Sequence, residues 1–447
     1  MKKFVCTKFS LVRFIIFSFT VLLALTSPSY RGSSADSGQA PALVYKSTDA
    51  GLTWLPADTG MELFPAHKAR ELAVDPNEAS ILYAGTSYGV FKSTDAANSW
   101  NPVSKGLPQR DVTGLAIDSL LPSTLYALSS NLDFNSGFVS RSNNGAVKWK
   151  SIGPSDFNFN TSIVIDPSSA STLYVGGDGL GQQNADLCGV YKSTDAGISW
   201  RFSRLGNYED TIEQLVVSPE DPSVVYASVK GGDEGLYKST DGGMTWKQIG
   251  FDSGPVALDP RNPSTIYLAG EVGLAKSIDA GETWSGVSFD FSPPSVISID
   301  SGSPSAIYVA GFENASGNSL SAKSTDGGST WQLLNLQGPV LCFAFDPSNP
   351  STVYACAQIP PPLITGVQIN GKALVVTGQG FHAGAVIEIS TDKTFNTLKT
   401  IFDTGSQGTL LTAPKGSRFI APGETVFIGV TEADQTQALG FQFTRPN

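Results

Sequence analysis

KSTDGGMTW, residues 238–246, is one of seven copies of a nine-residue pattern that decides the fold of this chain. The pattern reads basic residue, Ser, any residue, Asp, any residue, Gly, any residue, Thr and Trp. Its copies recur about every 46 residues and contain all seven tryptophans of the protein, which random placement would not produce. They end at Trp54, Trp100, Trp149, Trp200, Trp246, Trp284 and Trp331.

A second pattern also occurs seven times and reads apolar-x-apolar-Asp-Pro, a few turn residues, then apolar-Tyr-small. VALDPRNPSTIYLAG (256–270) is one copy. The alternation before Asp-Pro predicts a half-buried strand, and proline ends it because proline cannot donate to a sheet ladder. The apolar-Tyr segment predicts a second, returning strand. The seven copies begin at Leu72, Leu115, Ile163, Leu215, Val256, Ile297 and Phe343.

The two patterns together describe one four-stranded unit. In the first complete copy, residues 89–92 predict a third strand and Ser99-Trp100 opens a fourth. Four antiparallel strands per repeat correspond to one blade of a β-propeller. The last strand pair (343–356) has no third and fourth strand after it, whereas the first tryptophan copy (43–55) has no strand pair before it. We therefore expect the N-terminal segment to complete the seventh blade and close the ring.

The tryptophan pattern has a structural explanation. Its carboxylate or amide accepts N–H groups across a tight turn, glycine supplies a positive φ, and tryptophan packs at the blade edge. Ala97 and Ala146 replace the glycine, so their turns are expected to be weaker. The basic residue before each serine is interpreted as a strand residue that carries its charge out to solvent. The turn acceptors are Asp49, Asp95, Asn144, Asp195, Asp241, Asp279 and Asp326.

The KSTDxGxTW copies resemble the Asp-box, also called the bacterial neuraminidase (BNR) repeat, over roughly residues 42–358. Families with this box include sialidases, xyloglucan-cleaving glycoside hydrolases, sortilin-type receptors and photosystem II assembly factors. Pairing with the Asp-Pro hairpin makes the chain most similar to the assembly factors and the xyloglucanase propellers. The resemblance implies an all-β, seven-bladed propeller. It implies no single activity, because the box is architectural.

Features of the related enzymes are missing. Sialidases of this kind carry an Arg-Ile-Pro element and an arginine cluster, whereas this chain has no such tripeptide and few arginines. The resemblance to xyloglucanases places a catalytic Asp in the segment that is Gly85–Gly89 here, and that segment has no acid. The two histidines, His67 and His382, leave no basis for a histidine-rich zinc site or a Ser-His-Asp triad. A carboxylate-based glycoside hydrolase remains the alternative to a non-catalytic protein.

The long connections of the second to fourth blades are the candidate binding surface, because binding residues are commonly carried by irregular loops on a rigid scaffold. Aromatic residues among acids and amides suit a carbohydrate or a polar protein partner. A calcium site from Asp178, Asn184 and Asp186 is a further interpretation, without EF-hand spacing. No cofactor is expected. The candidate ligand-binding residues are Asp133, Phe134, Asp156, Phe157, Phe159, Asp178, Asp186, Tyr208 and Asp210.

Cysteines and the C-terminal segment give two further expectations. Cys342 and Cys356 flank the last hairpin, where an oxidising compartment would favour a disulfide, and Cys188 is expected to be buried. Pro360–Pro362 marks a domain boundary. Residues 363–447 predict a small β-sandwich, and ITGV (364–367) followed by VVTGQGF (375–381) resembles the IPT/TIG immunoglobulin-like domains of exported bacterial proteins. The resemblance implies a spacer or adhesive module.

The first 27 residues resemble a secretory signal peptide, with a basic start and an apolar run at 14–25. Cleavage near residue 27 or as late as residue 35, and an uncleaved anchor, are the open alternatives. Residues 28–41 form a polar linker. The formal charge is −11, and residues 1–27 contribute four basic residues and no acid. An acidic mature chain argues against nucleic-acid binding.

The sequence therefore predicts a monomeric protein that is secreted, periplasmic or at the cell surface. We expect it to bind an envelope or extracellular protein or polysaccharide through the loop face of the propeller, without catalysis. Carboxylate-based glycan cleavage and a scaffold role in the assembly of an envelope protein are the two alternatives. No stable membrane span is expected after signal cleavage.

Overall fold

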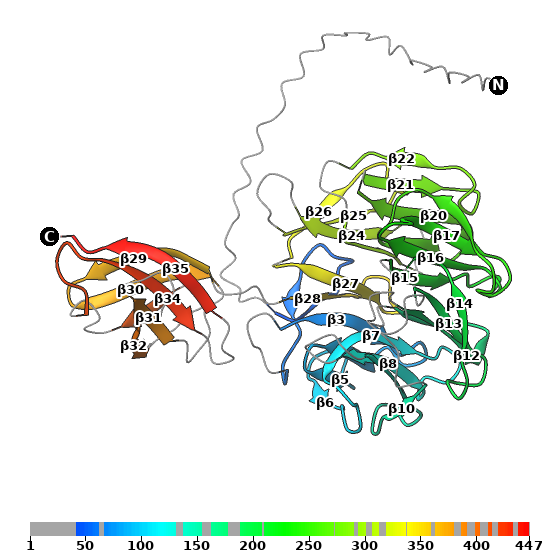
Figure 1. Ribbon diagram of the computed structural model, residues 1–447, viewed down its shortest axis with the longest axis horizontal. Coiled ribbons are helices and arrows are strands. Elements are labelled where there is room, and N and C mark those ends of the chain that lie inside the picture. Colours follow the sequence, from blue (N-terminus) through cyan, green and yellow to red (C-terminus); the bar gives the residue numbers. More distant parts are fainter. Residues whose placement is uncertain are drawn as a thin grey trace, which may run out of the picture. The chain divides into compact units, whose positions relative to one another are not determined.

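The protein is an all-β chain with a closed ring of seven four-stranded antiparallel sheets followed by a smaller β-sandwich (Figure 1). The computed structural model describes residues 42–61, 67–130, 137–153, 162–177, 188–207, 210–271, 273–289, 294–300, 306–312, 319–336, 338–358, 363–379, 386–390, 398–402, 410–413, 419–431 and 437–446.

Each sheet of the ring is one blade, numbered here in chain order. Blade 1 contains β3 (Ala69–Val74), β4 (Leu82–Thr86), β5 (Gly89–Ser93) and β6 (Asn101–Pro102). Blade 2 contains β7 (Asp111–Ile117), β8 (Leu125–Ser130), β9 (Gly137–Ser142) and β10 (Lys150–Ile152). Blade 3 contains β11 (Ile163–Asp166), β12 (Ser169–Gly177), β13 (Gly189–Ser193) and β14 (Arg201–Arg204). Blade 4 contains β15 (Thr211–Val217), β16 (Val225–Lys230), β17 (Gly235–Ser239) and β18 (Lys247–Gly250).

The remaining blades repeat this order. Blade 5 contains β19 (Val256–Asp259), β20 (Asn262–Gly270), β21 (Gly273–Ser277) and β22 (Ser285–Val287). Blade 6 contains β23 (Val296–Ile299), β24 (Ile307–Phe312), β25 (Ser319–Ser324) and β26 (Gln332–Leu334). Blade 7 combines β27 (Val340–Phe345) and β28 (Val353–Ala357) with β1 (Val44–Ser47) and β2 (Leu55–Pro56). The first strands of neighbouring blades contact one another around the whole ring, from β3 through β27 and back to β3.

The N-terminal segment closes the ring as the sequence predicted. β1 pairs antiparallel with β28, with Tyr45 opposite Ala355 and Lys46 opposite Tyr354. The last blade is therefore built from both ends of the propeller sequence, which leaves no unpaired sheet edge between the first and last blades.

The tryptophan pattern forms a tight turn whose aspartate is fully engaged. In blade 5, Asp279 Oδ1 accepts bonds from the Ser277 hydroxyl (2.7 Å) and the Thr283 amide (2.8 Å), and Oδ2 accepts the Thr283 hydroxyl. The threonine hydroxyl bond is the main reason why the pKa of Asp279 falls to about 2. Asp49, Asp195 and Asp326 show the same depressed pKa of about 2, with the same main cause, a bond from the Thr or Ser hydroxyl four residues on.

The two turns with alanine at the glycine position keep their hydrogen bonds. The amides of Ala97 and Ala146 donate to Ser93 and Ser142 at 2.9 and 3.0 Å. Their φ angles are 66° and 67°, in the left-handed region that favours glycine. The expected weakness therefore resides in backbone strain rather than in missing bonds.

In six of the seven turns the basic residue joins neighbouring blades, which corrects the interpretation that it extends its charge into solvent. Lys46, for example, lies over the ring of Tyr354 in its own blade and donates to the carbonyl of Ala96 in blade 1 at 2.8 Å. We call this contact the lysine latch. The other latches join Lys92 to Gly145, Lys192 to Gly242, Lys238 to Ala280, Lys276 to Gly327 and Lys323 to Ala50.

One junction differs from the other six. Arg141 of blade 2 lies over the ring of Tyr126. Its buried Nε has no hydrogen-bond partner among the described residues, whereas the Tyr126 hydroxyl donates to the Ala170 carbonyl of blade 3 at 3.5 Å. The contact between blades 2 and 3 therefore relies on tyrosine rather than on a latch.

The tryptophans face the preceding blade. Trp149 of blade 2 is 2% exposed, and its indole N–H donates to the Val103 carbonyl beyond blade 1 at 2.8 Å. Trp284 of blade 5 donates to Ile249 of blade 4 at 2.9 Å. Six blades thus bind the next blade through a lysine, and blade 2 is the exception. Five tryptophans donate toward the preceding blade, whereas Trp54 and Trp200 donate within their own turns.

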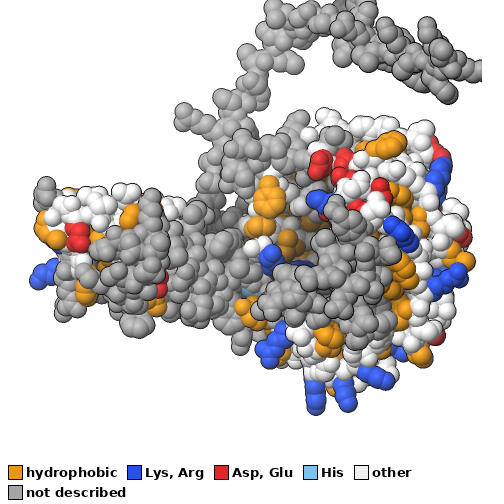
Figure 2. All heavy atoms as spheres, viewed as in Figure 1, with side chains coloured by type: hydrophobic (Ala, Val, Ile, Leu, Met, Phe, Trp, Pro, Cys, Tyr) orange, Lys and Arg blue, Asp and Glu red, His pale blue; other side chains and the backbone are white. Residues whose placement is uncertain are grey.

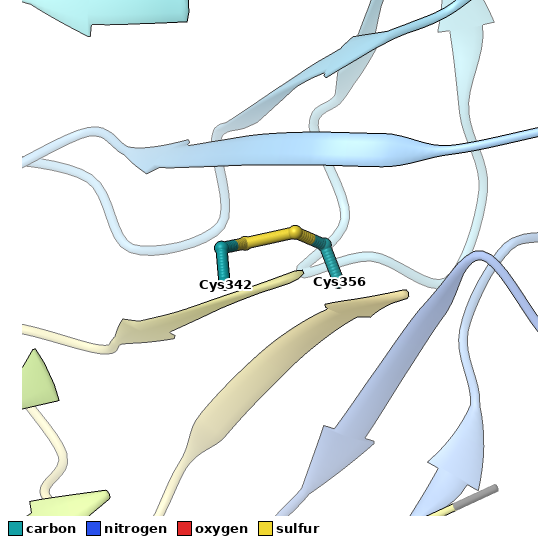
Figure 3. Close-up of a disulfide and its surroundings, with 2 residues drawn as sticks. All are labelled: Cys342 and Cys356. Carbon is teal, nitrogen blue, oxygen red and sulfur yellow. A yellow bond between two sulfur atoms is a disulfide. The ribbon is translucent and has the colours of Figure 1, made fainter. Parts of the chain in front are cut away.

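A disulfide lies inside blade 7. Cys342 on β27 is opposite Cys356 on β28, and the two residues form the bond shown in Figure 3. Both cysteines are at most 8% exposed. The bond joins the two strands to which the N-terminal segment adds its own pair. Cys188 is fully buried, as the sequence predicted.

The C-terminal segment forms two sheets around one core. The first sheet contains β29 (Leu363–Asn370), β30 (Ala373–Gln379) and β33 (Leu410–Ala413). The second contains β31 (Val386–Ser390), β32 (Leu398–Phe402), β34 (Thr425–Thr431) and β35 (Gln437–Thr444). Leu374, Val376 and Leu411 of the first sheet share a core with Ile387 and Ile428 of the second, which is sandwich packing. Residues 1–41, which contain the predicted signal peptide and linker, lie outside the described part. Within the described ranges, no helix has the length and hydropathy that a membrane span requires.

The latch across the ring closure is tested by Lys323→Met, which keeps the aliphatic stem and removes the charge. Lys323 donates to Ala50 at 2.9 Å and lies 5.1 Å from the Tyr308 ring centre. We expect the free energy of unfolding in urea to fall by about 1–3 kcal/mol. Lys247→Met, which removes an exposed ion pair with Glu282, is the control and should cost less than about 1 kcal/mol. Equal losses in the two variants would contradict a latch.

Acid should weaken the propeller in a defined pH window. Because the pKa of Asp279 is about 2 in the folded chain and 3.8 as its ordinary value, its stabilising effect is complete above pH 3.8 and disappears as the pH falls toward 2. Thr283→Val should lower the melting temperature at pH 6 and reduce the further loss between pH 4 and pH 2. Thr240→Val, an exposed threonine in an equivalent turn, is the control. Parallel melting curves for both variants would argue against this role of the hydroxyl.

Candidate functional site

A cavity of about 890 Å³ lies on the propeller axis and is lined by residues of all seven blades, most of them in or just before the innermost strands. Its wall also includes Lys230 at the end of β16 and Glu271 after β20, which belong to connections between second and third strands. The Asp-Pro turns lie at the other end of the inner strands and take no part in it. The cavity is therefore on the side of the irregular loops, which is the face that the sequence analysis singled out.

The blade structure itself aims side chains into this cavity. Near the start of the inner strand, just after a buried residue, β3, β7, β15 and β27 each shift register, as a β-bulge does. A bulge bends a strand and re-aims one side chain. The residue after the shift lines the cavity in all four strands: Glu71, Gly114, Gln214 and Cys342.

Three glutamates and one lysine supply the charges of the cavity wall. Glu213 forms an ion pair with Lys230 at 3.5 Å, and these side chains are 31% and 59% exposed. Glu71 forms no hydrogen bond or ion pair with a described residue. Burial raises its pKa from 4.5 to about 7, because no neighbouring cation or donor offsets the lost hydration. Glu271 lines the rim, where its amide donates to Asp252 at 2.9 Å.

A second ion pair braces the wall beside Glu71. Arg70 of β3 contacts the buried carboxylate of Asp111, which opens β7 in the next blade, and also approaches the Val112 carbonyl. Successive residues of a strand point in opposite directions, so Arg70 reaches the next blade while its neighbour Glu71 lines the cavity.

One buried and one half-buried carboxylate hold the surrounding loops. Asp210 is fully buried and accepts the amides of Asn207 (2.5 Å) and Asp233 (3.1 Å). Ser253 donates to Glu234 at 2.6 Å across the same side of blade 4. Figure 2 shows acidic side chains gathered on the upper part of the near face of the propeller, with Lys and Arg side chains along its lower rim.

Only one of the predicted ligand-binding residues lies in the described part of the chain. Asp210 is described, and both of its carboxylate oxygens serve the loop backbone. The others, and the conceivable calcium ligands, lie outside the described residues, so their roles stay predictions: Asp133, Phe134, Asp156, Phe157, Phe159, Asp178, Asn184, Asp186 and Tyr208. Within the described ranges, no three His, Cys, Asp or Glu side chains gather as a metal site would require.

The sequence analysis missed Glu71, although the repeat contained the signal. Aligning the seven copies of the Asp-Pro pattern places Glu71 directly before the first pattern residue, at a position that is never acidic in the other copies. Those copies have Gly114, Ser162, Gln214, Pro255, Val296 and Cys342 there. An acid that the repeat does not require, on a strand that faces the axis, could have been marked as a candidate.

Comparison with known proteins gives a fold and no family. No family model and no curated protein matches the chain. Among solved structures, the Niastella koreensis GH74 enzyme is 17% identical, with 85% of this chain and 73% of that chain covered and a TM-score of 0.54. The GH74 xyloglucanase of Xanthomonas campestris is 14% identical, with 86% and 62% covered and a TM-score of 0.53. YCF48 bound to D1 peptide is 13% identical, with 71% and 99% covered and a TM-score of 0.47. At these identities the first two likenesses establish the propeller fold alone.

Glu71→Gln should reveal the cost of the confined carboxylate. Because the pKa of Glu71 is higher in the folded chain than its ordinary value, the folded protein loses stability as the pH rises from 4.5 through 7. We therefore expect equal stability of wild type and variant at pH 4, and at pH 8 a variant more stable by about 1–3 kcal/mol. Chemical denaturation at the two pH values measures this difference. A variant that is less stable at pH 8 would mean that an unseen partner stabilises the charge.

Proposed function

We propose that this is an exported, non-catalytic binding or scaffold protein that holds an envelope or extracellular protein or polysaccharide on the loop face of its propeller. In this proposal the seven tryptophan turns are Asp-boxes, residues 1–27 direct export, and the C-terminal sandwich is an IPT/TIG-like spacer. The observation that carries the proposal is the axial cavity, which opens on the irregular loops and is lined by all seven blades.

A difference between the turn face and the loop face of the propeller supports binding on the loop face. On the face of the Asp-Pro and tryptophan turns, the aspartates, serines and lysines are committed to the turns and latches, as Asp279 and Lys323 show. On the loop face, Glu71 and Glu271 have no ionic partner among the described residues. Uncommitted charges on a rigid surface are available to a ligand.

A glycoside hydrolase is the second candidate, and one observation favours it. Glu71, with its pKa raised to about 7, lines the same cavity as Glu213, and glycosidases use one protonated and one ionised carboxyl group. The solved GH74 enzymes share the fold, and one of them is a xyloglucanase.

The proposal is tested with the full mature chain on a glycan array and in a pull-down from envelope extract. Glu271→Lys reverses a charge at the cavity rim, and we expect it to weaken capture of the partner at least tenfold. Glu282→Lys makes the same change in the turn of blade 5 and should leave capture unchanged. If neither assay finds a ligand, or if both variants behave alike, the loop face is not the binding surface.

The same preparations separate binding from turnover. Wild type and Glu71→Gln are incubated with xyloglucan and other polysaccharides, and reducing ends are measured over time. The binding proposal expects no release by either protein. Release by wild type that is lost in Glu71→Gln would instead establish the hydrolase.

A further inference from the structure

Glu71 is an exception within a sevenfold repeat. The other six blades fold with a neutral residue at its position, so the blade does not need a carboxylate there. Gln214 occupies the position in blade 4, and it shows that a side chain of this length fits without a charge. A half-buried acid that costs stability and that the fold can omit calls for an explanation outside folding.

The charged groups around the cavity leave Glu71 without a counter-ion. Lys230 is held by Glu213 on β15 and β16, and Arg70 is directed to Asp111 between blades 1 and 2. Glu271 at the rim adds a further negative charge. Cys342 occupies the position of Glu71 in blade 7, adjacent in the ring, and is in a disulfide, so it carries no charge. The lining therefore has an excess of negative charge, and the unmatched carboxylate inside it belongs to Glu71.

We propose that the axial cavity receives a lysine side chain from an extended segment of a partner protein, whose ammonium group pairs with Glu71. This inference rests on the proposed binding function and specifies the partner of that site. A cavity of about 890 Å³ has room for a lysine side chain and part of the chain that carries it. The described residues offer no cluster of three ligands for a metal ion, so an organic cation is the better fit to this cavity.

Confinement makes such a site selective. An ammonium group that enters the cavity pairs with the Glu71 carboxylate and compensates for its lost hydration. A neutral side chain does not compensate for this loss. Pairing favours the ionised carboxyl group, so binding near neutral pH releases a proton from the fraction of Glu71 that is protonated. Because burial raises the pKa of Glu71 to about 7, the charge of this carboxyl group changes in this pH range.

The test is calorimetric titration of the full mature chain at low ionic strength. The probe is a capped five-residue peptide with one central lysine flanked by glycine and serine. With a pKa of about 7 for Glu71, we expect affinity at pH 8 to be about tenfold higher than at pH 6. Glu71→Gln should weaken binding at pH 8 about tenfold and remove the pH dependence. Glu282→Gln, far from the cavity lining, should retain both.

The inference is overturned if wild type does not bind the lysine peptide, if the same peptide with an acetylated lysine binds equally well, or if the affinity of Glu71→Gln is unchanged. Free n-butylammonium that binds as tightly as the peptide would also overturn it, because the partner would then need no chain. A partner captured from envelope extract equally by wild type and Glu71→Gln would reject this inference and leave the proposed function standing.

Discussion

The lysine latch is the contact on which the propeller depends. A sheet of four strands has two edges and two apolar faces, and it becomes stable only when neighbouring blades cover those faces. Apolar packing between blades is non-directional, so it does not by itself fix the angle of one blade to the next. A charged donor such as Lys192, held over Tyr174 and bonded to Gly242 of the next blade at 2.9 Å, sets that angle. Six such bonds direct the ring toward closure.

Closure follows from the same contact. Lys323 of blade 6 reaches Ala50, and Lys46 of blade 7 reaches Ala96. Both bonds involve the N-terminal segment, which is also paired with β28 and adjoins the disulfide-bonded hairpin of β27 and β28. The two ends of the ring are therefore held by sheet pairing, by latches and by a covalent bond in one blade. Several stabilising contacts are needed in this blade because its two halves are about 300 residues apart in the chain, so the loss of chain entropy on closure is largest there.

The fold could be predicted from the sequence because the tryptophan turn is a local pattern that recurs seven times. Tryptophan spacing predicted the blades, and the unmatched pair at 343–356 predicted that Val44–Ser47 would complete the last one. The direction of the lysines was predicted wrongly, because their acceptor is a backbone carbonyl in the next repeat and no residue type marks a carbonyl. Asp210 was recognised as a loop residue, but its bonds to the amides of Asn207 and Asp233 depend on a loop shape that no pattern encodes. Glu71 was missed because it differs from the residues at its position in the other six copies, so a pattern built from their shared residues does not contain it.

Repetition offers a way to separate folding from function within one chain. A position that is filled alike in seven blades, such as the serine that binds the turn aspartate, reports what the blade needs. A position that varies freely among small, polar and apolar residues reports that the blade has no requirement there. An ionisable residue at such a position carries a cost that its own blade does not compensate, as the raised pKa of Glu71 records. The seven blades thus act as internal controls for one another. This comparison places the residue that the fold does not require on the axis of the ring and not in the repeated turns, so the axis is the expected place of a ligand site.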